Sequence, residues 1–412
     1  MRKTILFAPA TYNLAETTRC IQIAKAIKKS ARCVFLSYGG EFEFLIREEG
    51  FQLHRLKPSI TTKKTIHLYK IHHGKKLGEL FSRNEIDKQV HAEIELIDQV
   101  KPVCIVTGFS PSTSISARVR NIPLVWITQT TWEIKTALNN MTIEYFDKLD
   151  FPVLQVLPNI IKNYLSRILY EIYSRLIIRP YNQVASKYKI INFKHFEELW
   201  KGDYQLQAES LWFNRQKTKS NEFFIGPLLA EIERDVPKQV KNIDRRKEII
   251  YLAMGSSARK ELLLGIIESF RNTDYLVITP SKSYFKDQEY NFPENVIVTD
   301  WFPAQIINDI ADLSLIHGGI GTIMNAIKAG KPIIGIGMMA EQEANLLAAE
   351  RLGICMRISR NRLRMDELHS LIRLALADKN MLDRARHYSK LIKKEDVNKS
   401  ISSFFSQVFA VN

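Results

Sequence analysis

The residues with the clearest chemical potential lie between positions 301 and 342. Trp301 opens the run W-F-P, His317 opens the glycine-rich run H-G-G-I-G-T, and Glu341-Gln342 form an acid-amide pair. An indole can stack on a base, a glycine-rich turn can hold a diphosphate, and carboxylate and amide groups can bond sugar hydroxyls. Taken in this order, these residues outline a site for a nucleotide-sugar.

The glycine-rich run is expected on a strand, a turn and a helix. An apolar stretch at 310–316 precedes it, and the helical pattern that begins at Thr322 stops at Gly330-Lys331-Pro332. The glycines let backbone amides approach an anion, and the start of a helix adds partial positive charge. His317 and Thr322 can donate to phosphate oxygens. A second turn at Gly255-Ser256 follows another apolar strand and is expected at the same sheet edge.

The extended pattern resembles the donor signature of family 1 UDP-glycosyltransferases, and it is closest in spacing to the bacterial macrolide glycosyltransferases. The resemblance implies an α/β protein of the GT-B fold, in which two Rossmann-like domains face each other across a cleft. It also implies that Trp301 stacks on the base, that His317 and Thr322 hold the diphosphate, and that Glu341 and Gln342 bond the hexose. The donor-binding residues expected on this basis are Ser256, Trp301, His317, Gly319, Gly321, Thr322, Asn325, Glu341 and Gln342. The competing interpretation makes Trp301 a core aromatic residue and Glu341 a solvated helix residue.

Two positions depart from the family pattern. Ala304 stands where the family usually has Gln, with Gln305 next to it, and Asn325 stands where the family usually has a Glu for the ribose hydroxyls. An amide can still bond a diol, but it lacks the charge that strengthens such a bond. The choice between a UDP and a dTDP donor therefore stays open.

The family's catalytic residues are absent from the aligned positions. The family uses a His near the first strand, in a Gly-His pair, and an Asp after a later strand; here Ala15-Glu16 aligns with the first and Gly108 with the second. Glu16 is the candidate catalytic base, provided that burial raises its pKa toward neutrality. Three alternatives remain: a favourable carboxylate in the first turn of a helix, a ligand for a cationic acceptor group, and loss of catalysis.

Length and composition fit a globular protein with two core-bearing domains. The 412 residues are about half apolar, with a formal net charge of +15. No apolar run is long enough to span a membrane, so we expect a cytoplasmic protein, possible at the membrane only as a peripheral contact. The four cysteines show no paired spacing, which predicts neither a disulfide nor a metal site, and no cofactor other than the nucleotide-sugar co-substrate is expected. The basic charge favours an anionic donor or membrane surface, although compositional bias explains it equally well, and no nucleic-acid motif is present.

Strands and helices alternate along both halves of the chain. The pattern predicts strands at 4–9, 33–37, 103–107 and 124–128, and again at 249–254, 275–279, 295–298, 313–316 and 332–337, with helices at 17–29 and 41–49. We expect an acceptor-binding domain at 1–228, a nucleotide-sugar-binding domain at 229–395, and a last helix at 396–412 that crosses back to the first domain. The run Gly226-Pro227-Leu228 marks the boundary.

The stretch 151–189 has the pattern of an amphipathic helix. Leu165, Leu169, Ile172 and Leu176 recur at helical spacing among basic residues. The default interpretation is domain core. The alternatives are a wall of the acceptor pocket and a patch that meets a membrane surface.

These observations favour an inverting glycosyltransferase that transfers a hexose from a UDP- or dTDP-sugar to a small, partly apolar acceptor such as a natural product. Three rivals remain: a membrane-associated transferase with a lipid acceptor, a nucleotide-sugar 2-epimerase, and a non-catalytic partner that binds nucleotide-sugar. The residues of the acceptor pocket match no known pattern, so the acceptor stays undefined.

Overall fold

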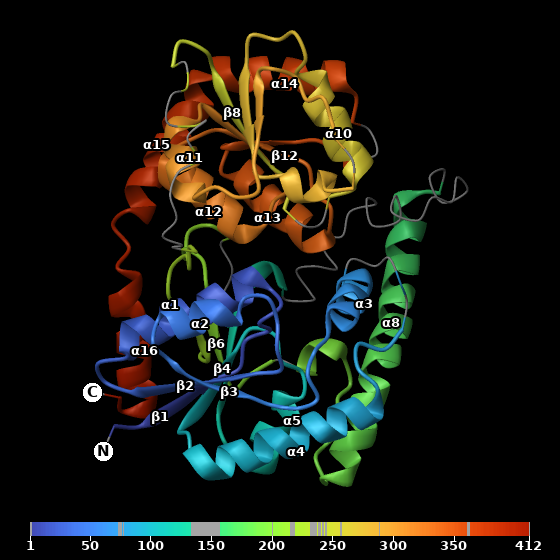
Figure 1. The fold of residues 1–412 in the computed structure, drawn as a ribbon, viewed down its shortest axis with the longest axis vertical. Helices are drawn as coiled ribbons and strands as arrows, with labels where there is room; N and C mark the ends of the chain where they lie inside the picture. The colour runs from blue at the N-terminus through green and yellow to red at the C-terminus, as the bar shows by residue number, and fades with distance from the viewer. Residues whose placement is uncertain are drawn as a thin grey trace.

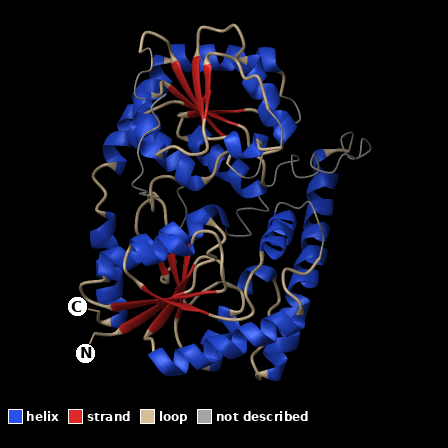
Figure 2. Ribbon diagram, viewed as in Figure 1, coloured by secondary structure: helices blue, strands red, loops and turns tan. Residues whose placement is uncertain are grey.

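The computed structural model contains two parallel sheets, each covered by helices on both faces (Figures 1 and 2). It describes residues 2–72, 76, 78–132, 157–199, 201–214, 219–230, 237, 240, 243, 245–255, 258–287, 289–360 and 363–411. This is the doubly wound α/β architecture expected from alternating apolar strands and amphipathic helices.

The N-terminal sheet has the strand order β3-β2-β1-β4-β5-β6-β7, and every neighbouring pair is parallel. Its strands are β1 (Thr4–Phe7), β2 (Arg32–Ser37), β3 (Gln52–Arg55), β4 (Cys104–Thr107), β5 (Leu124–Thr128), β6 (Tyr204–Gln207) and β7 (Glu222–Phe224). Its helices are α1 (Leu14–Ile27), α2 (Glu43–Glu48), α3 (Thr62–His72), α4 (Arg83–Val100), α5 (Thr113–Val119), η1 (Thr130–Trp132), α8 (Asn159–Lys187) and η3 (Phe196–Leu199).

The C-terminal sheet repeats the plan with the order β10-β9-β8-β11-β12-β13. Its strands are β8 (Ile249–Ala253), β9 (Leu276–Thr279), β10 (Val296–Val298), β11 (Leu313–Ile316), β12 (Ile333–Gly335) and β13 (Cys355–Arg357). The helices of this half are α10 (Lys260–Ser269), η4 (Lys282–Phe285), α11 (Ala304–Ile310), α12 (Ile320–Ala329), α13 (Ala340–Arg351), α14 (Met365–Ala377) and α15 (Lys379–Ile392).

The last helix, α16 (Val397–Phe409), lies on the N-terminal half, where both chain ends are found (Figure 1). It packs against α1, and its Phe404 and Phe405 are buried in the same core as β1 and β2. The Lys3 ammonium donates to the Phe409 carbonyl at 2.8 Å. Burial of these phenyl rings stabilises the crossing by about 2 kcal/mol per side chain, which ties the end of the chain to its beginning.

The expectation of domain core is wrong for part of α8. Ile172 is 52% exposed and Leu176 is 42% exposed, whereas the next turns bury Ile177, Ile178 and Tyr181. Leu165 is half-buried, and the side chain of Leu169 lies outside the described residues. One face of the helix packs on the core formed with α4 through Tyr173, Ile177 and Tyr181, and the opposite face, with Ile172 and Leu176, is exposed.

All four cysteines are buried thiols. Within the described part of the chain, no group of three or more His, Cys, Asp or Glu side chains could hold a metal ion. None of the described helices is long and apolar enough to cross a bilayer.

Candidate active site

The glycine-rich turn joins the end of β11 to the start of α12. Gly318 adopts φ +88°, a conformation that favours glycine, and a Cβ there would lie 2.6 Å from Leu346 Cγ. Gly319 is the N-cap of α12. A Cβ on Gly321 would meet nothing within 4 Å, so the first turn of the helix borders open space. An anion can therefore approach the unpaired amides at this helix start.

His317 lies at the meeting point of both strand-end turns. A Cβ on either Gly255 or Gly319 would come within 2.7 Å of the His317 Nε2 atom, so both turns must be glycine where they touch the ring. Nδ1 donates to the Ala253 carbonyl at 3.0 Å. Burial lowers the pKa of the imidazole, and this hydrogen bond opposes the change. The ring is therefore neutral, with Nε2 as its only remaining acceptor.

Thr322 and Asn325, two further residues predicted to bind the nucleotide-sugar, lie one turn apart on α12. The backbone N–H of Thr322 donates to the Gly319 carbonyl at 2.9 Å. The Asn325 amide donates to the Gly321 carbonyl at 2.8 Å, and its carbonyl oxygen is buried with no protein partner. That oxygen is an acceptor, and a ribose hydroxyl is the kind of donor it lacks.

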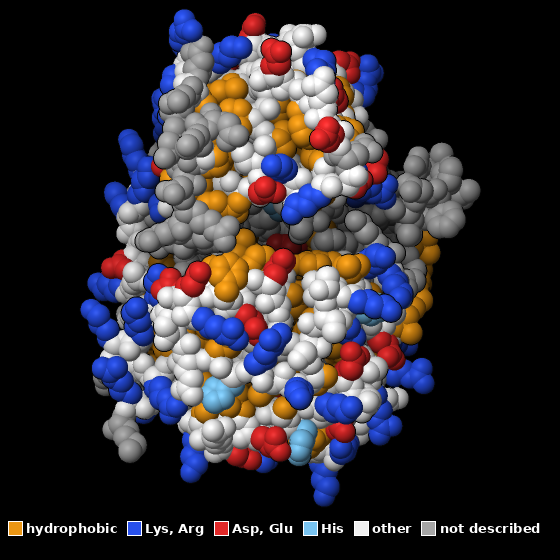
Figure 3. Space-filling view, viewed as in Figure 1, with side chains coloured by type: hydrophobic (Ala, Val, Ile, Leu, Met, Phe, Trp, Pro, Cys, Tyr) orange, Lys and Arg blue, Asp and Glu red, His pale blue; other side chains and the backbone are white. Residues whose placement is uncertain are grey.

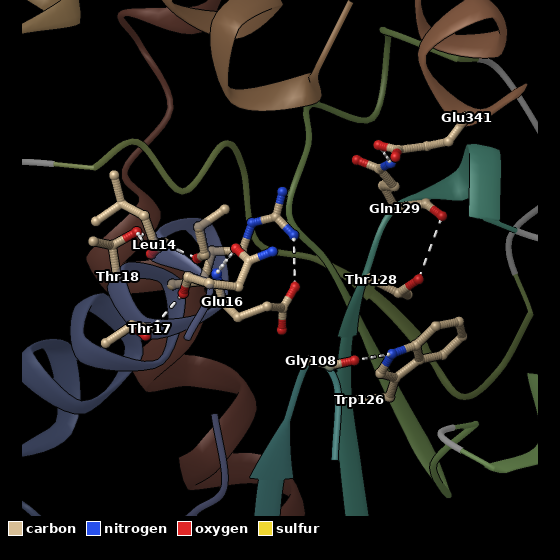
Figure 4. A network of polar contacts seen from close by, with 12 residues as sticks. Leu14, Glu16, Thr17, Thr18, Gly108, Trp126, Thr128, Gln129 and Glu341 are labelled. Carbon is tan, nitrogen blue, oxygen red and sulfur yellow. Dashed lines mark hydrogen bonds and ion pairs between the residues drawn. The ribbon is translucent and has the colours of Figure 1, made fainter. Parts of the chain in front are cut away.

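The acid-amide pair opens α13, after β12. The Gln342 carbonyl oxygen accepts from the Met338 N–H at 2.9 Å, so this half of the amide holds the start of the helix. Glu341 Oε1 accepts from Gln129 of the N-terminal half and from Asn345 at 3.3 Å. In Figure 4 the Gln129 and Glu341 side chains point toward each other. Glu341 therefore lies where the two domains meet.

The structure says less about Trp301 and Ser256, two further residues predicted to bind the nucleotide-sugar. Trp301 follows the carboxyl end of β10, where its carbonyl accepts from Thr299 Oγ1 at 3.4 Å, and its side chain is half-buried. Its stacking on a base stays a prediction. Ser256 lies outside the described residues, but the Gly255 that precedes it borders the His317 ring.

Glu16 lies in the first turn of α1 and faces Gly108, at the end of β4. A Cβ on Gly108 would fall 1.7 Å from Glu16 Oε2, so the carboxylate fills the space that any side chain at 108 would occupy. The helix cap is supplied by Asn13, whose Oδ1 accepts from the Glu16 N–H at 3.3 Å. The Glu16 side chain is thus not required as a cap.

The charge of Glu16 is only partly compensated. Arg19 lies 3.5 Å from Oε1, the side chain is 16% exposed, and Oε2 is buried with no protein partner. Burial raises the pKa of this carboxyl, Arg19 opposes the rise, and Glu341 adds to it. Figure 4 shows Glu16 on α1 and Glu341 on the C-terminal half in the same region, with Glu341 directed at Gln129.

The sequence analysis missed Gln129, Thr131 and Glu209. Thr131 donates from Oγ1 to Asn345 Oδ1 at 2.8 Å, so it also bridges the domains. Gln129 comes directly after the apolar strand β5, which is the one signal that could have found it, whereas β6 before Glu209 is half polar and gives no such signal. Their contacts depend on partners more than 70 positions away, which no local pattern encodes.

The chain is similar in sequence and in fold to known glycosyltransferases. The profile of the glycosyltransferase family 28 C-terminal domain matches residues 246–401. A PGL/p-HBAD biosynthesis glycosyltransferase of Mycobacterium tuberculosis is 24% identical over 398 residues, which cover 94% of this chain and 88% of the relative. The spinosyn forosaminyltransferase SpnP superposes with a TM-score of 0.72 at 12% identity and full coverage of both chains. The glycosyltransferase VinC, solved with dTDP, has a TM-score of 0.66 at 13% identity and covers 97% and 98% of the two chains.

The sequence relatives and the matching profile are of glycosyltransferases, and the solved structures share the two-domain GT-B architecture. They do not favour the epimerase or the non-catalytic partner. The protein is therefore a glycosyltransferase of the GT-B fold, similar to the family 1 enzymes.

Proposed function

We propose that the protein transfers a hexose, with inversion, from a UDP- or dTDP-hexose to a hydroxyl of a small, partly apolar acceptor. The observation that carries the proposal is that Glu16 lies against Gly108, just after β4, with a buried oxygen that has no protein partner, while Glu341 contacts Gln129, just after β5. Because β4 and β5 are parallel neighbours, Gly108 and Gln129 lie at one edge of the sheet, and so do the two carboxylates that contact them. Among the comparisons, a VinC structure solved with dTDP supports a nucleotide diphosphate donor.

In this mechanism Glu16 is the general base. Its Oε2 takes the proton of the acceptor hydroxyl while that oxygen bonds to the anomeric carbon, and the bond from this carbon to the diphosphate oxygen breaks. Attack from the face opposite the leaving group inverts the anomeric centre. The raised pKa of Glu16 suits the task, because a base works best when its pKa is close to the working pH.

The leaving diphosphate is stabilised by the start of α12. Unpaired amides at this helix start and the open approach beside Gly321 place donors where negative charge increases as the glycosidic bond breaks. The fold holds these amides in position before the substrate binds, so little reorganisation is needed during the reaction. Glu341 and Gln342 would hold the hexose between this turn and Glu16.

A small hollow of about 20 Å³ at the carboxyl edge of the N-terminal sheet is partly apolar, and it would have to widen to admit an acceptor. Tyr12, Phe81, Phe109 and Ile60 line it, together with Ser110 and other residues at the carboxyl edge of the N-terminal sheet. Burial, Tyr69 and the charge of Glu16 all raise the pKa of Tyr12, one of the residues that line this hollow. Aromatic walls with a few hydroxyls suit an acceptor with an apolar body and a polar reacting group. The spinosyn forosaminyltransferase among the structural neighbours is named for a natural product, which favours this acceptor class.

The decisive experiment is Glu16→Gln, measured by turnover and by titration with UDP and dTDP. We expect transfer to be lost and nucleotide affinity to be unchanged, because the amide keeps the shape of the carboxylate but cannot take a proton at neutral pH. Glu341→Gln is the comparison variant, and it should raise the donor KM instead. Full turnover by Glu16→Gln would return Glu16 to a structural role.

A membrane-held acceptor is a second candidate, and α8 favours it. Ile160 is 83% exposed, and the stripe continues through Tyr164, Ile168, Ile172 and Leu176, all exposed. Exposed Arg167, Arg175 and Arg179 lie on the same helix. Orange side chains are visible at the edge of the molecule where α8 runs (Figures 1 and 3). An apolar stripe with cationic neighbours suits the surface of an anionic bilayer.

Vesicle co-sedimentation tests this candidate. Wild type should sediment with vesicles that contain phosphatidylserine and less with phosphatidylcholine alone, and the double variant Ile172→Ser/Leu176→Ser should stay in solution. Equal sedimentation of wild type and variant would remove α8 from the interaction. Transfer to a water-soluble acceptor serves as the control that the variant is folded.

A further inference from the structure

Four residues at the end of β5 reach from the N-terminal half to the helix that carries Glu341. Gln129 donates to Glu341 Oε1, and Thr131 donates to Asn345 Oδ1 at 2.8 Å. Asn345 in turn donates to the Gly318 carbonyl at 3.1 Å. This segment, 129–132, is called the bridging turn below. It links the N-terminal sheet to both the acid of α13 and the glycine-rich turn.

The bridging turn is itself held by a buried carboxylate. Glu209, just after β6, is fully buried, and its Oε1 accepts from the Thr130 N–H at 2.9 Å. Asn214 donates to Thr130 Oγ1 at 2.9 Å. Thr130 lies between the two residues that contact α13, so the position of its backbone fixes both of them.

Two buried oxygens at this place have no protein partner. They are Glu209 Oε2 and Gln129 Oε1, on residues that are 0% and 1% exposed. A buried acceptor left without a donor destabilises the folded protein, because its hydrogen bond to water is lost and not replaced. Such a cost is retained in native proteins mainly where a ligand or water supplies the missing donor.

We propose that Glu209 is a positioning residue for the donor hexose: through Thr130 it fixes the bridging turn, whose Gln129 holds Glu341 and accepts a hydroxyl of the sugar. The inference rests on the proposed function, because it takes Glu341 as part of the hexose site. It adds that the N-terminal half, and not the C-terminal half alone, determines how tightly the hexose is held.

The charge on Glu209 sets the strength of this support. Burial raises the pKa of Glu209 to about 7, while the Thr130 hydrogen bonds and the charge of Arg19 oppose the rise. Arg19 is shared with Glu16, at 3.5 Å, so Glu209 does not have this cation to itself. A carboxylate accepts the Thr130 N–H more strongly than a carboxylic acid does. Hexose binding is therefore expected to tighten as pH rises through about 7.

The test compares two dissociation constants, that of UDP and that of UDP-glucose, with dTDP and dTDP-glucose run in parallel. The dissociation constant of UDP divided by that of UDP-glucose isolates the contribution of the hexose to binding, because both ligands carry the same base and diphosphate. We expect Glu209→Ala to lower the ratio about tenfold, since the bridging turn loses its support. Glu209→Gln keeps an acceptor for Thr130, so it should retain most of the ratio but lose its change with pH near 7.

Glu43→Gln is the matched control, because Glu43 is also a buried carboxylate of the N-terminal half and is 6% exposed. It should leave the ratio unchanged even if the melting temperature falls. The double variant Glu209→Ala/Gln129→Ala should be no weaker than Gln129→Ala, because one residue acts through the other.

A wild-type ratio in Glu209→Ala, or an equal loss for UDP and UDP-glucose, would overturn the inference. If Glu341→Gln lowers the ratio and Glu209→Ala does not, the proposed function stands and only the role of Glu209 fails. If wild type binds neither nucleotide, both fail together.

Discussion

Substitution of Gly108 by Ala should disable catalysis without replacing any reacting group. The new Cβ would fall 1.7 Å from Glu16 Oε2, and real Cβ atoms are essentially never found within 3.0 Å of another atom, so this oxygen must move by at least about 1.3 Å. A displacement of about 1 Å at a reacting group costs roughly a hundredfold in rate. The strain is expected to cost about 1–3 kcal/mol of stability as well.

The assay is kcat at saturating donor and acceptor, with the affinity for UDP and dTDP measured on the same samples. We expect kcat to fall about a hundredfold and nucleotide affinity to be unchanged, because the glycine-rich turn lies in the other domain. Gly265→Ala is the control: its Cβ would meet only Met365 Cε at 3.6 Å, so activity should be retained. Wild-type kcat in Gly108→Ala would refute the assignment of Glu16 as base.

Three further predictions concern the protonation of Glu16 and His317 and the glycine-rich turn. Because the pKa of Glu16 is raised in the folded protein, this carboxyl contributes stability that is fully present below its pKa in the unfolded chain and is lost as the pH rises through its pKa in the folded protein. Glu16→Gln should therefore raise the melting temperature near pH 8 and lose this advantage near pH 4. A drop in the melting temperature of Glu16→Gln at pH 8 would contradict this. The neutral His317 ring must gain a proton before Nε2 can donate to phosphate. Calorimetry in buffers of different ionisation heat should therefore detect proton uptake when UDP-glucose binds at neutral pH. The variant His317→Gln should abolish this proton uptake. No uptake by wild type would remove this ring from phosphate binding. Gly318→Ala should cost stability and UDP affinity together, because its Cβ would approach the Gln342 carbonyl to 2.7 Å at a φ of +88°, and a normal melting temperature would show that the turn can relax.

The strands and the glycine-rich turn were predictable because their signals are local. Apolar runs bounded by turn residues placed β5, β8 and β11 within one residue of their observed ends. The strand β3 was missed because Gln52–Arg55 is polar and lies at the sheet edge, where apolar residues are not required. The outward stripe of α8 could not be predicted, since helical periodicity shows that one face is apolar but not which face the rest of the fold covers.

The site residues divide along the same line. His317 and Glu341 belong to a pattern with fixed spacing, so the sequence alone predicts that they bind one ligand. Glu209 and Gln129 come together only because β5 and β6 are neighbours in the sheet and end at the same edge. Their importance depends on strand order, which the sequence does not state.

Four buried oxygens of the candidate site also indicate which kind of ligand it binds. Glu16 Oε2, Gln129 Oε1, Glu209 Oε2 and Asn325 Oδ1 are all buried and without a protein partner, and all four are oxygens that accept hydrogen bonds when the carboxyls are ionised. A phosphate group cannot satisfy them, because it offers only further acceptors. A hexose, a ribose and an acceptor alcohol each carry hydroxyl donors. The proposed site, with the diphosphate at the amides of the glycine-rich turn, would leave these oxygens for hydroxyl groups, which a nucleotide-sugar together with an alcohol supplies.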